Sequence, residues 1–168
     1  MFKLLKIISS ATLCGILLLA APTTEAATVR YTFSGIVDSG SLAGETFSGE
    51  LQFDNSGLTH TGTESVPLSF FSLNFLATAF DLTNADNTPT AEFLNGGFLG
   101  FSYSVSAFDP LFAFIPSSFG LALDQPYFSY NPVSGGAGFG SLNLIPEPMS
   151  LALFSLGLAG MGLVRRRS

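Results

Sequence analysis

The chain has 168 residues, of which 47% are hydrophobic and only 11% are charged, and its mean hydropathy is +0.47. So few charges argue against both an ordinary cytosolic enzyme and a disordered chain. Between residues 28 and 145, ten carboxylates accompany a single arginine, a net charge of −9. Nucleic-acid binding requires clustered cations, so we expect no nucleic-acid partner.

Residues 1–26 have the features of a secretory signal peptide. Lys3 and Lys6 precede the apolar run 7–21, and the small residues Thr24 and Ala26 stand at positions −3 and −1 for cleavage after Ala26. As a helix the apolar run would be about 22 Å long, which is short of a bilayer core of about 30 Å and argues against an uncleaved anchor. The sequence therefore predicts export by the Sec machinery and cleavage by signal peptidase.

Residues 27–145 are predicted to form one phenylalanine-rich β domain, which holds 16 of the 18 phenylalanines. Apolar and polar residues alternate with a period of two in several runs, and no helical period is sustained. Asn95-Gly96-Gly97 is the best candidate for a tight hairpin. The clearest alternating runs are 29–37, 46–53, 99–106 and 119–124. Short strands in this succession predict an all-β, antiparallel fold, which is a β-sandwich, a jelly roll or a small barrel.

Three local features of this domain add expectations. The dense apolar run 70–76 is expected to be buried on both faces. The phrase Thr-Phe-Ser-Gly occurs at 32–35 and again at 46–49, which predicts two adjacent antiparallel strands of similar design. The glycine-rich stretch 134–140 is either a loop before a final strand or the start of a tether, and we expect the tether to begin near Ile145.

The sequence offers no convincing catalytic set, so we expect no enzyme. Cys14 is the only cysteine and lies in the leader, so the mature chain has no thiol for catalysis, disulfides or metal binding. His60 is the only histidine and lies in a polar, turn-like segment without a nucleophile elbow. We interpret it as an exposed loop residue, and an exported hydrolase that depends on it is a remote alternative.

Calcium is the metal that the chain is best equipped to bind. The candidate ligands offer hard oxygen atoms within seven residues of one another, and they are Asp81, Asn84, Asp86 and Asn87. Their spacing matches neither an EF-hand loop nor a calcium-binding nonapeptide repeat, so a turn rich in Asp and Asn without any metal is the alternative. No other cofactor is expected.

The C-terminus has three parts in a fixed order. Pro146-Glu147-Pro148 comes first, then the uncharged run 149–164, then Arg165, Arg166 and Arg167. A helix of sixteen residues spans about 24 Å, and snorkelling arginines would cover the remaining thickness of a bilayer. The arginines also fit a cytoplasmic stop under the positive-inside rule. This pattern predicts a transmembrane helix over 149–164 with the body of the protein on the periplasmic side.

These three parts together resemble the PEP-CTERM sorting signal of exported bacterial proteins. The resemblance covers residues 146–168 and is specific because the elements stand in the family's order at the extreme C-terminus, with a signal peptide at the other end. It implies that Pro146, Glu147 and Pro148 are recognised by exosortase, a membrane-embedded processing peptidase, and that the arginines belong to the same signal. It further implies a route through the inner membrane to the cell surface or extracellular matrix, in bacteria that produce exopolysaccharide.

Two functions are compatible with these features. The first is a noncatalytic surface or matrix protein that the sorting signal directs. The second is a lectin-like module that binds extracellular polysaccharide, with or without calcium. For the second, Tyr127, Phe128 and Tyr130 form an aromatic cluster suited to stacking on sugar rings, although core packing is the commoner use of such residues.

Overall fold

The computed structural model describes residues 28–117 and 125–147. Within these ranges it contains nine β-strands and one short 3₁₀ turn, η1 (Leu82–Asn84), and no α-helix. The strands are β1 (Thr28–Val37), β2 (Thr46–Asp54), β3 (Thr63–Phe75), β4 (Thr78–Asp81), β5 (Thr90–Leu94), β6 (Gly97–Val105), β7 (Leu111–Ile115), β8 (Tyr127–Asn131) and β9 (Gly138–Pro146).

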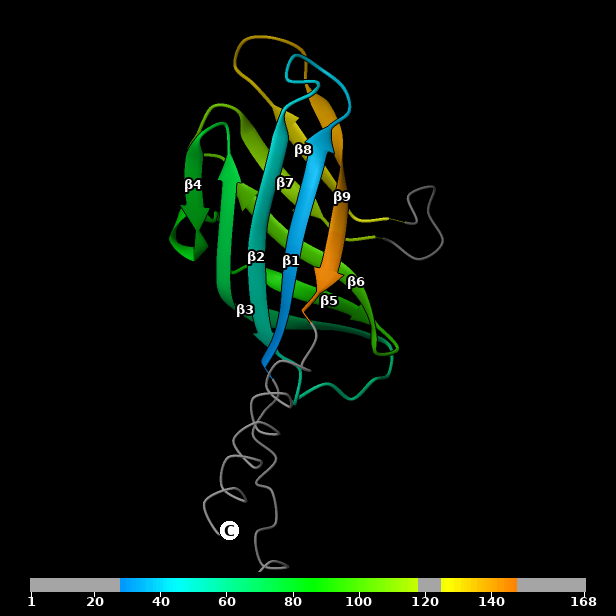
Figure 1. Ribbon diagram of the computed structural model, residues 1–168. Helices are drawn as coiled ribbons and strands as arrows, with labels where there is room; N and C mark the ends of the chain where they lie inside the picture. The colour runs from blue at the N-terminus through cyan, green and yellow to red at the C-terminus, as the bar shows by residue number, and fades with distance from the viewer. Residues whose placement is uncertain (1–27, 118–124, 148–168) are drawn as a thin grey trace, which may run out of the picture.

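The strands form one antiparallel sheet that closes on itself (Figure 1). Their order is β2-β1-β9-β8-β7-β6-β5-β3-β4, and β2 also pairs with β3. That pairing closes eight strands into a barrel and leaves β4 as an additional strand beside β3. Closure depends on the long β3, because its first half pairs with β5 and its second half pairs with β2 and β4. The all-β, antiparallel prediction is confirmed, and of the three architectures considered the small barrel is the correct one.

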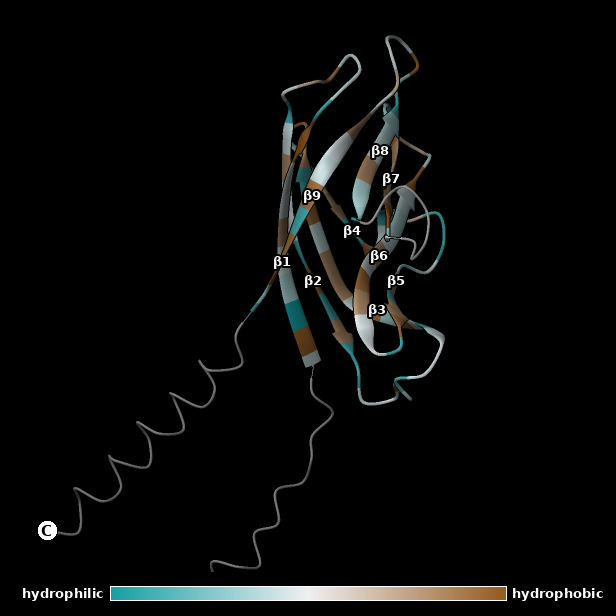
Figure 2. Ribbon diagram, turned by 90° about the vertical axis from the view of Figure 1, so that its right-hand side faces the viewer, coloured by the Kyte–Doolittle hydropathy of each residue, from teal (hydrophilic) through white to brown (hydrophobic). Residues whose placement is uncertain are grey.

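Aromatic rings fill the interior of the barrel. Colours along the strands alternate between hydrophobic and hydrophilic residues, as expected when one face of each strand is buried (Figure 2). Among the described residues no polar or charged side chain is buried, apart from the tyrosines. The buried aromatic residues are Phe33, Phe47, Phe53, Phe71, Phe75, Phe80, Phe93, Phe101, Tyr103, Phe112, Phe114, Phe128 and Tyr130. Burial of each such side chain contributes about 1.5–3 kcal/mol to the stability of the fold. Together these side chains can stabilise the core without a disulfide.

The two Thr-Phe-Ser-Gly phrases lie on β1 and β2 and pair with each other, as predicted. The register places Phe33 opposite Gly49 and Gly35 opposite Phe47. Each ring covers the opposing glycine: a Cβ atom added to Gly35 would lie 2.6 Å from Cε2 of Phe47, and one added to Gly49 would lie 2.8 Å from Cε1 of Phe33. The repeated phrase is therefore a reciprocal packing unit, in which each glycine makes room for the phenylalanine of the other strand.

Two of the hairpin connections are two-residue turns with positive φ at both positions. Asn95 and Gly96 connect β5 to β6 with φ of 50° and 80°, which confirms the hairpin predicted there. Leu76 and Ala77 connect β3 to β4 with φ of 50° and 57°. Leucine and alanine rarely adopt this conformation, so nothing in the sequence signals the second turn.

The observed strands decide two predictions made for single segments, 70–76 and 134–140. The run 70–76 alternates instead of being buried on both faces, because Phe70 is 41% exposed while Phe71, Leu73 and Phe75 point into the core. The stretch 134–140 leads into a final strand, since β9 begins at Gly138, so the alternative of a tether starting there is wrong. The predicted alternation over 119–124 lies outside the described residues.

The first and the last described strands lie side by side, and the chain enters and leaves the barrel at the same end (Figure 1). Tyr31 of β1 is opposite Pro146 of β9, at the very end of the last strand. The predicted sorting segment therefore begins beside the first paired residues of β1, the first described strand.

The loops at the opposite end of the barrel are tied to one another. The Ser41 backbone N–H donates to the carbonyl oxygen of Gly136 at 3.0 Å, which joins the β1–β2 loop to the β8–β9 loop. The Val133 N–H donates to Asp109 Oδ1 at 2.9 Å, which joins the β8–β9 loop to the β6–β7 loop. This end of the barrel is thus braced by contacts between loops that are distant in the sequence.

Candidate functional site

Pro146 and Glu147, the first two residues of the predicted sorting motif, lie against the barrel. β9 extends through Pro146, one residue past the predicted end of the β domain. The Glu147 backbone N–H donates to the carbonyl oxygen of Arg30 at 3.0 Å, which continues the β1–β9 pairing by one more contact. The motif therefore begins where strand pairing ends.

Arg30 is the only cation of the described residues, and it lies between two carboxylates. Its Nε atom is 2.9 Å from Glu50 Oε1 and 3.6 Å from Glu147 Oε2. Gln52 donates a further hydrogen bond to Glu50 Oε1 at 2.9 Å. All these side chains are partly exposed, so the ion pairs stabilise the fold by at most about 1 kcal/mol and mainly orient Glu147.

The other residues of the predicted processing signals lie outside the described residues. They are Ala26, Pro148, Arg165, Arg166, Arg167 and the predicted helix 149–164. Among the described residues, no helix has the length and apolarity needed to cross a bilayer.

The candidate calcium ligands are engaged in hydrogen bonds with their own surroundings. Asp81 caps η1: its Oδ1 accepts from the Thr83 N–H at 2.8 Å and from Thr83 Oγ1 at 2.6 Å, while Asn84 Oδ1 accepts from the Asp81 N–H at 2.8 Å. The carboxylate of Asp86 instead accepts from the hydroxyl and the backbone N–H of Ser106 at 2.7 and 3.0 Å. The structure thus brings Asp81 and Asn84 together but turns Asp86 toward another segment.

These hydrogen bonds also change the acidity of the two carboxyl groups. The Thr83 hydroxyl and N–H hold the pKa of Asp81 below its ordinary value, and the Ser106 hydroxyl and N–H do the same for Asp86. Among the described residues, no three side chains of the types His, Cys, Asp and Glu form a group that could hold a metal ion.

His60 is exposed and lies in the loop between β2 and β3 with a φ of 59°. Its ring lies against Gly96 of the β5–β6 turn, because a Cβ atom added there would lie 2.6 Å from His60 Nδ1. Glu64 organises the same loop, accepting from the N–H and hydroxyl of Thr59 at 2.7 and 2.9 Å, which lowers the pKa of Glu64. His60 thus packs against the β5–β6 turn, at a position where Gly96 leaves room for its ring.

The aromatic cluster considered for sugar stacking belongs mostly to the core. Phe128 is fully buried and Tyr130 is 2% exposed, so the hypothesis that their faces stack on a sugar is wrong. The hydroxyl of Tyr130 donates to the Ser39 carbonyl at 3.0 Å and accepts from the Leu42 N–H at 2.8 Å, which ties the β1–β2 loop to the barrel. Tyr127 is half-buried on the outer face.

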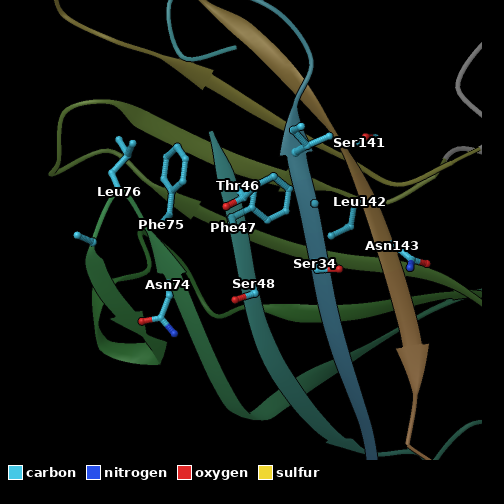
Figure 3. A pocket seen from close by; sticks show the side chains of 13 residues that line it. Ser34, Thr46, Phe47, Ser48, Asn74, Phe75, Leu76, Ser141, Leu142 and Asn143 are labelled. Carbon is cyan, nitrogen blue, oxygen red and sulfur yellow. The ribbon is translucent and has the colours of Figure 1, made fainter. Parts of the chain in front are cut away.

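A groove on the outer face of β9, β1, β2 and β3 has a volume of about 700 Å³. The register places four polar side chains in one row across these strands: Asn143, Ser34, Ser48 and Asn74. Figure 3 shows them side by side on neighbouring strands. None of the residues lining the groove is charged.

The sequence contains one signal for this row, in its repeated motif. Ser34 and Ser48 are the serines of the two Thr-Phe-Ser-Gly phrases, and the register that pairs the phrases also places these serines opposite each other. Because side chains alternate across a strand, the serine between an inward phenylalanine and an inward glycine must point outward. Asn74 and Asn143 could not be added from sequence, since their place in the row depends on closure of the barrel.

Apolar residues form the rim of the groove beside this row. Ile36 is 44% exposed and Leu76 is 37% exposed, and both line the groove. Leu76 and Ala77 form the left-handed β3–β4 turn, so an unusual backbone conformation stands at this rim.

Comparison of the chain with protein-family models, with curated proteins and with solved structures gives no match. The resemblance of residues 146–168 to a sorting signal therefore remains an expectation based on those residues.

Proposed function

We propose that the chain is an exported, noncatalytic surface or matrix protein, whose barrel is displayed outside the inner membrane and sorted by residues 146–168. The observation that carries this proposal is that the first described strand enters the barrel at the end where the last described strand leaves it. β1 begins at Thr28, and Pro146, the last residue of β9, is opposite Tyr31, three residues into β1. A barrel with both ends on one side can be held at a membrane by either end while its braced loops face away.

In this proposal signal peptidase removes residues 1–26, the helix 149–164 holds the intermediate in the membrane, and an exosortase-type peptidase recognises Pro146, Glu147 and Pro148. The contacts of Glu147 with Arg30 support the proposal because they fix the start of the motif next to the folded barrel. A peptidase in the membrane would then meet the motif at the membrane-proximal end of the body.

The test replaces Pro146, Glu147 and Pro148 with alanine and follows the intact mass of the protein in membranes, on the cell surface and in the medium. The matched control replaces Pro132, Val133 and Ser134 with alanine in the β8–β9 loop at the far end. The proposal expects the first variant to accumulate at higher mass in the membrane, whereas the control is processed like the natural chain. Equal processing of both variants would refute the sorting function.

A second candidate function is the binding of a polysaccharide by the barrel. The specific observation that favours it is the uncharged groove on the outer face, which is lined by hydroxyl and amide groups. This groove replaces the aromatic cluster as the candidate sugar-binding surface, because Phe128 and Tyr130 of that cluster are buried.

A further inference from the structure

We propose that the groove across β9, β1, β2 and β3 is a binding site for a neutral polysaccharide chain, and that Asn143, Ser34, Ser48 and Asn74 supply its hydrogen bonds. This inference rests on the second candidate function and assigns its site and ligand class. It does not depend on how the chain is sorted.

The first support is that the four polar side chains are available. All four are exposed, and none of them makes a side-chain hydrogen bond to another described residue. Serine hydroxyls and asparagine amides both donate and accept hydrogen bonds, as sugar hydroxyls do. The row is thus a set of uncommitted groups whose chemistry matches a hydroxyl-rich ligand.

The second support is the shape of the row. Neighbouring strands lie roughly 4.8 Å apart, so four side chains on four adjacent strands extend over about 14 Å. The two central residues are serines, Ser34 and Ser48, which leave room for a chain to lie across the sheet. At the rim, Ile36 and Leu76 present apolar surface that can contact the C–H face of a sugar ring.

The third support is charge. No charged side chain lines the groove, and the body around it carries a net charge of −9 over residues 28–145. An anionic polymer would be repelled by this body, while a cationic polymer would find no carboxylate in the groove. A neutral glycan incurs neither penalty.

Other occupants fit less well. A peptide that binds by strand addition needs free backbone groups at a sheet edge, but each of these four strands is paired on both sides. A second copy of the chain would require an interface with an apolar centre, whereas the centre of this groove is the polar pair Ser34 and Ser48.

The experiment measures binding of the full-length chain, kept in a detergent without a sugar headgroup, to neutral dextran and a neutral soluble cellulose ether. Anionic alginate is the charged comparison. Ser48→Arg fills the centre of the groove with a long side chain, and Ser102→Arg is the matched control at an exposed strand serine outside the groove. The double variant Asn74→Ala/Asn143→Ala removes both amides without adding bulk. The unfolding midpoints of this variant and of Ser48→Arg are compared with that of the natural chain, to confirm that each variant folds.

We expect a dissociation constant in the micromolar to millimolar range for at least one neutral glycan and none measurable for alginate. Ser48→Arg should weaken binding at least tenfold and the asparagine double variant several-fold, while Ser102→Arg stays within twofold. If the natural chain binds neither neutral glycan at millimolar concentration, the glycan-binding function itself is refuted. If it binds but Ser48→Arg has no effect, or Ser102→Arg weakens binding equally, the assignment to the groove is overturned while glycan binding stands. If the natural chain forms a dimer that Ser48→Arg dissociates, the assignment to the groove is also overturned, because a second copy of the chain then occupies the groove.

Discussion

The reciprocal packing of β1 and β2 makes a strong prediction for Gly35→Ala. The added Cβ atom would lie 2.6 Å from Cε2 of Phe47 and closer still to Cζ of that ring and to the carbonyl oxygen of Ser141. Carbon atoms prefer separations of about 3.5–4.0 Å, so the ring must shift by about 1 Å. The Ser141 oxygen belongs to the backbone of β9 and cannot move without the strand. Overpacking costs about 1–3 kcal/mol, and we expect the upper end of that range.

The assay is urea unfolding of Gly35→Ala beside a matched control, Gly57→Ala. No atom lies within 4 Å of a Cβ added to Gly57, and its φ is not positive. The control should therefore stabilise the protein by about 0.4–1 kcal/mol, because alanine restricts the unfolded chain. The two identical substitutions are thus predicted to change the free energy of unfolding in opposite directions. A value for Gly35→Ala within about 0.5 kcal/mol of the natural protein would refute the packing argument, since a surface change has that size.

Three further predictions concern the core, a turn and acid stability. Phe114→Ala should destabilise the barrel by about 3–5 kcal/mol in urea unfolding, because this 1%-exposed ring packs among other buried rings such as Phe33, Phe101 and Phe128. Phe108 is 43% exposed, so Phe108→Ala should cost about 1 kcal/mol or less. Equal costs for the two variants would contradict a core centred on Phe114. Leu76→Asn/Ala77→Gly should raise stability by about 1 kcal/mol, because these residues suit a turn with positive φ; a loss would show that burial of Leu76 dominates. Hydrogen bonds hold certain carboxyl pKa values below their unfolded values, so the stability they add is present above about pH 4 and is lost as the pH falls through the lowered values. These carboxyl groups are Glu64, Asp81, Asp86 and also Asp54, whose Oδ1 accepts from the Ser56 N–H at 2.8 Å. The urea midpoint should therefore decrease between about pH 5 and pH 2.5, and a constant midpoint would contradict the stabilising role of these hydrogen bonds.

Elements built from local patterns were predictable from the sequence. Alternation identified β1, β2 and β6, since each exposes one face and buries the other. The Asn95-Gly96 hairpin was predictable because these two residues accept positive φ at low cost. The repeated Thr-Phe-Ser-Gly phrase correctly predicted that β1 and β2 are neighbours.

Features that depend on closure were not predictable. The run 70–76 is dense in apolar residues, yet its even and odd positions face opposite sides, and only the pairing of β3 with β2 and β4 shows which side is the interior. The Leu76-Ala77 turn has no turn residues, and it forms because β3 and β4 must connect over two residues. The groove was missed for the same reason, since its row of side chains comes from four strands that closure brings together.

The last strand connects the proposed binding site to the proposed sorting segment, and its register limits where processing can occur. Asn143 lies three residues before Pro146 on β9, and the pairing with β1 runs from Val37 opposite Gly140 to Tyr31 opposite Pro146. A cut beyond Pro146 leaves every one of these pairs in place, so the released barrel would keep both its closure and its groove. A cut immediately before Asn143 would remove part of the row and four of the seven residue pairs that join β1 to β9. The motif begins at the last paired residue, where the chain can be cut without loss of the fold.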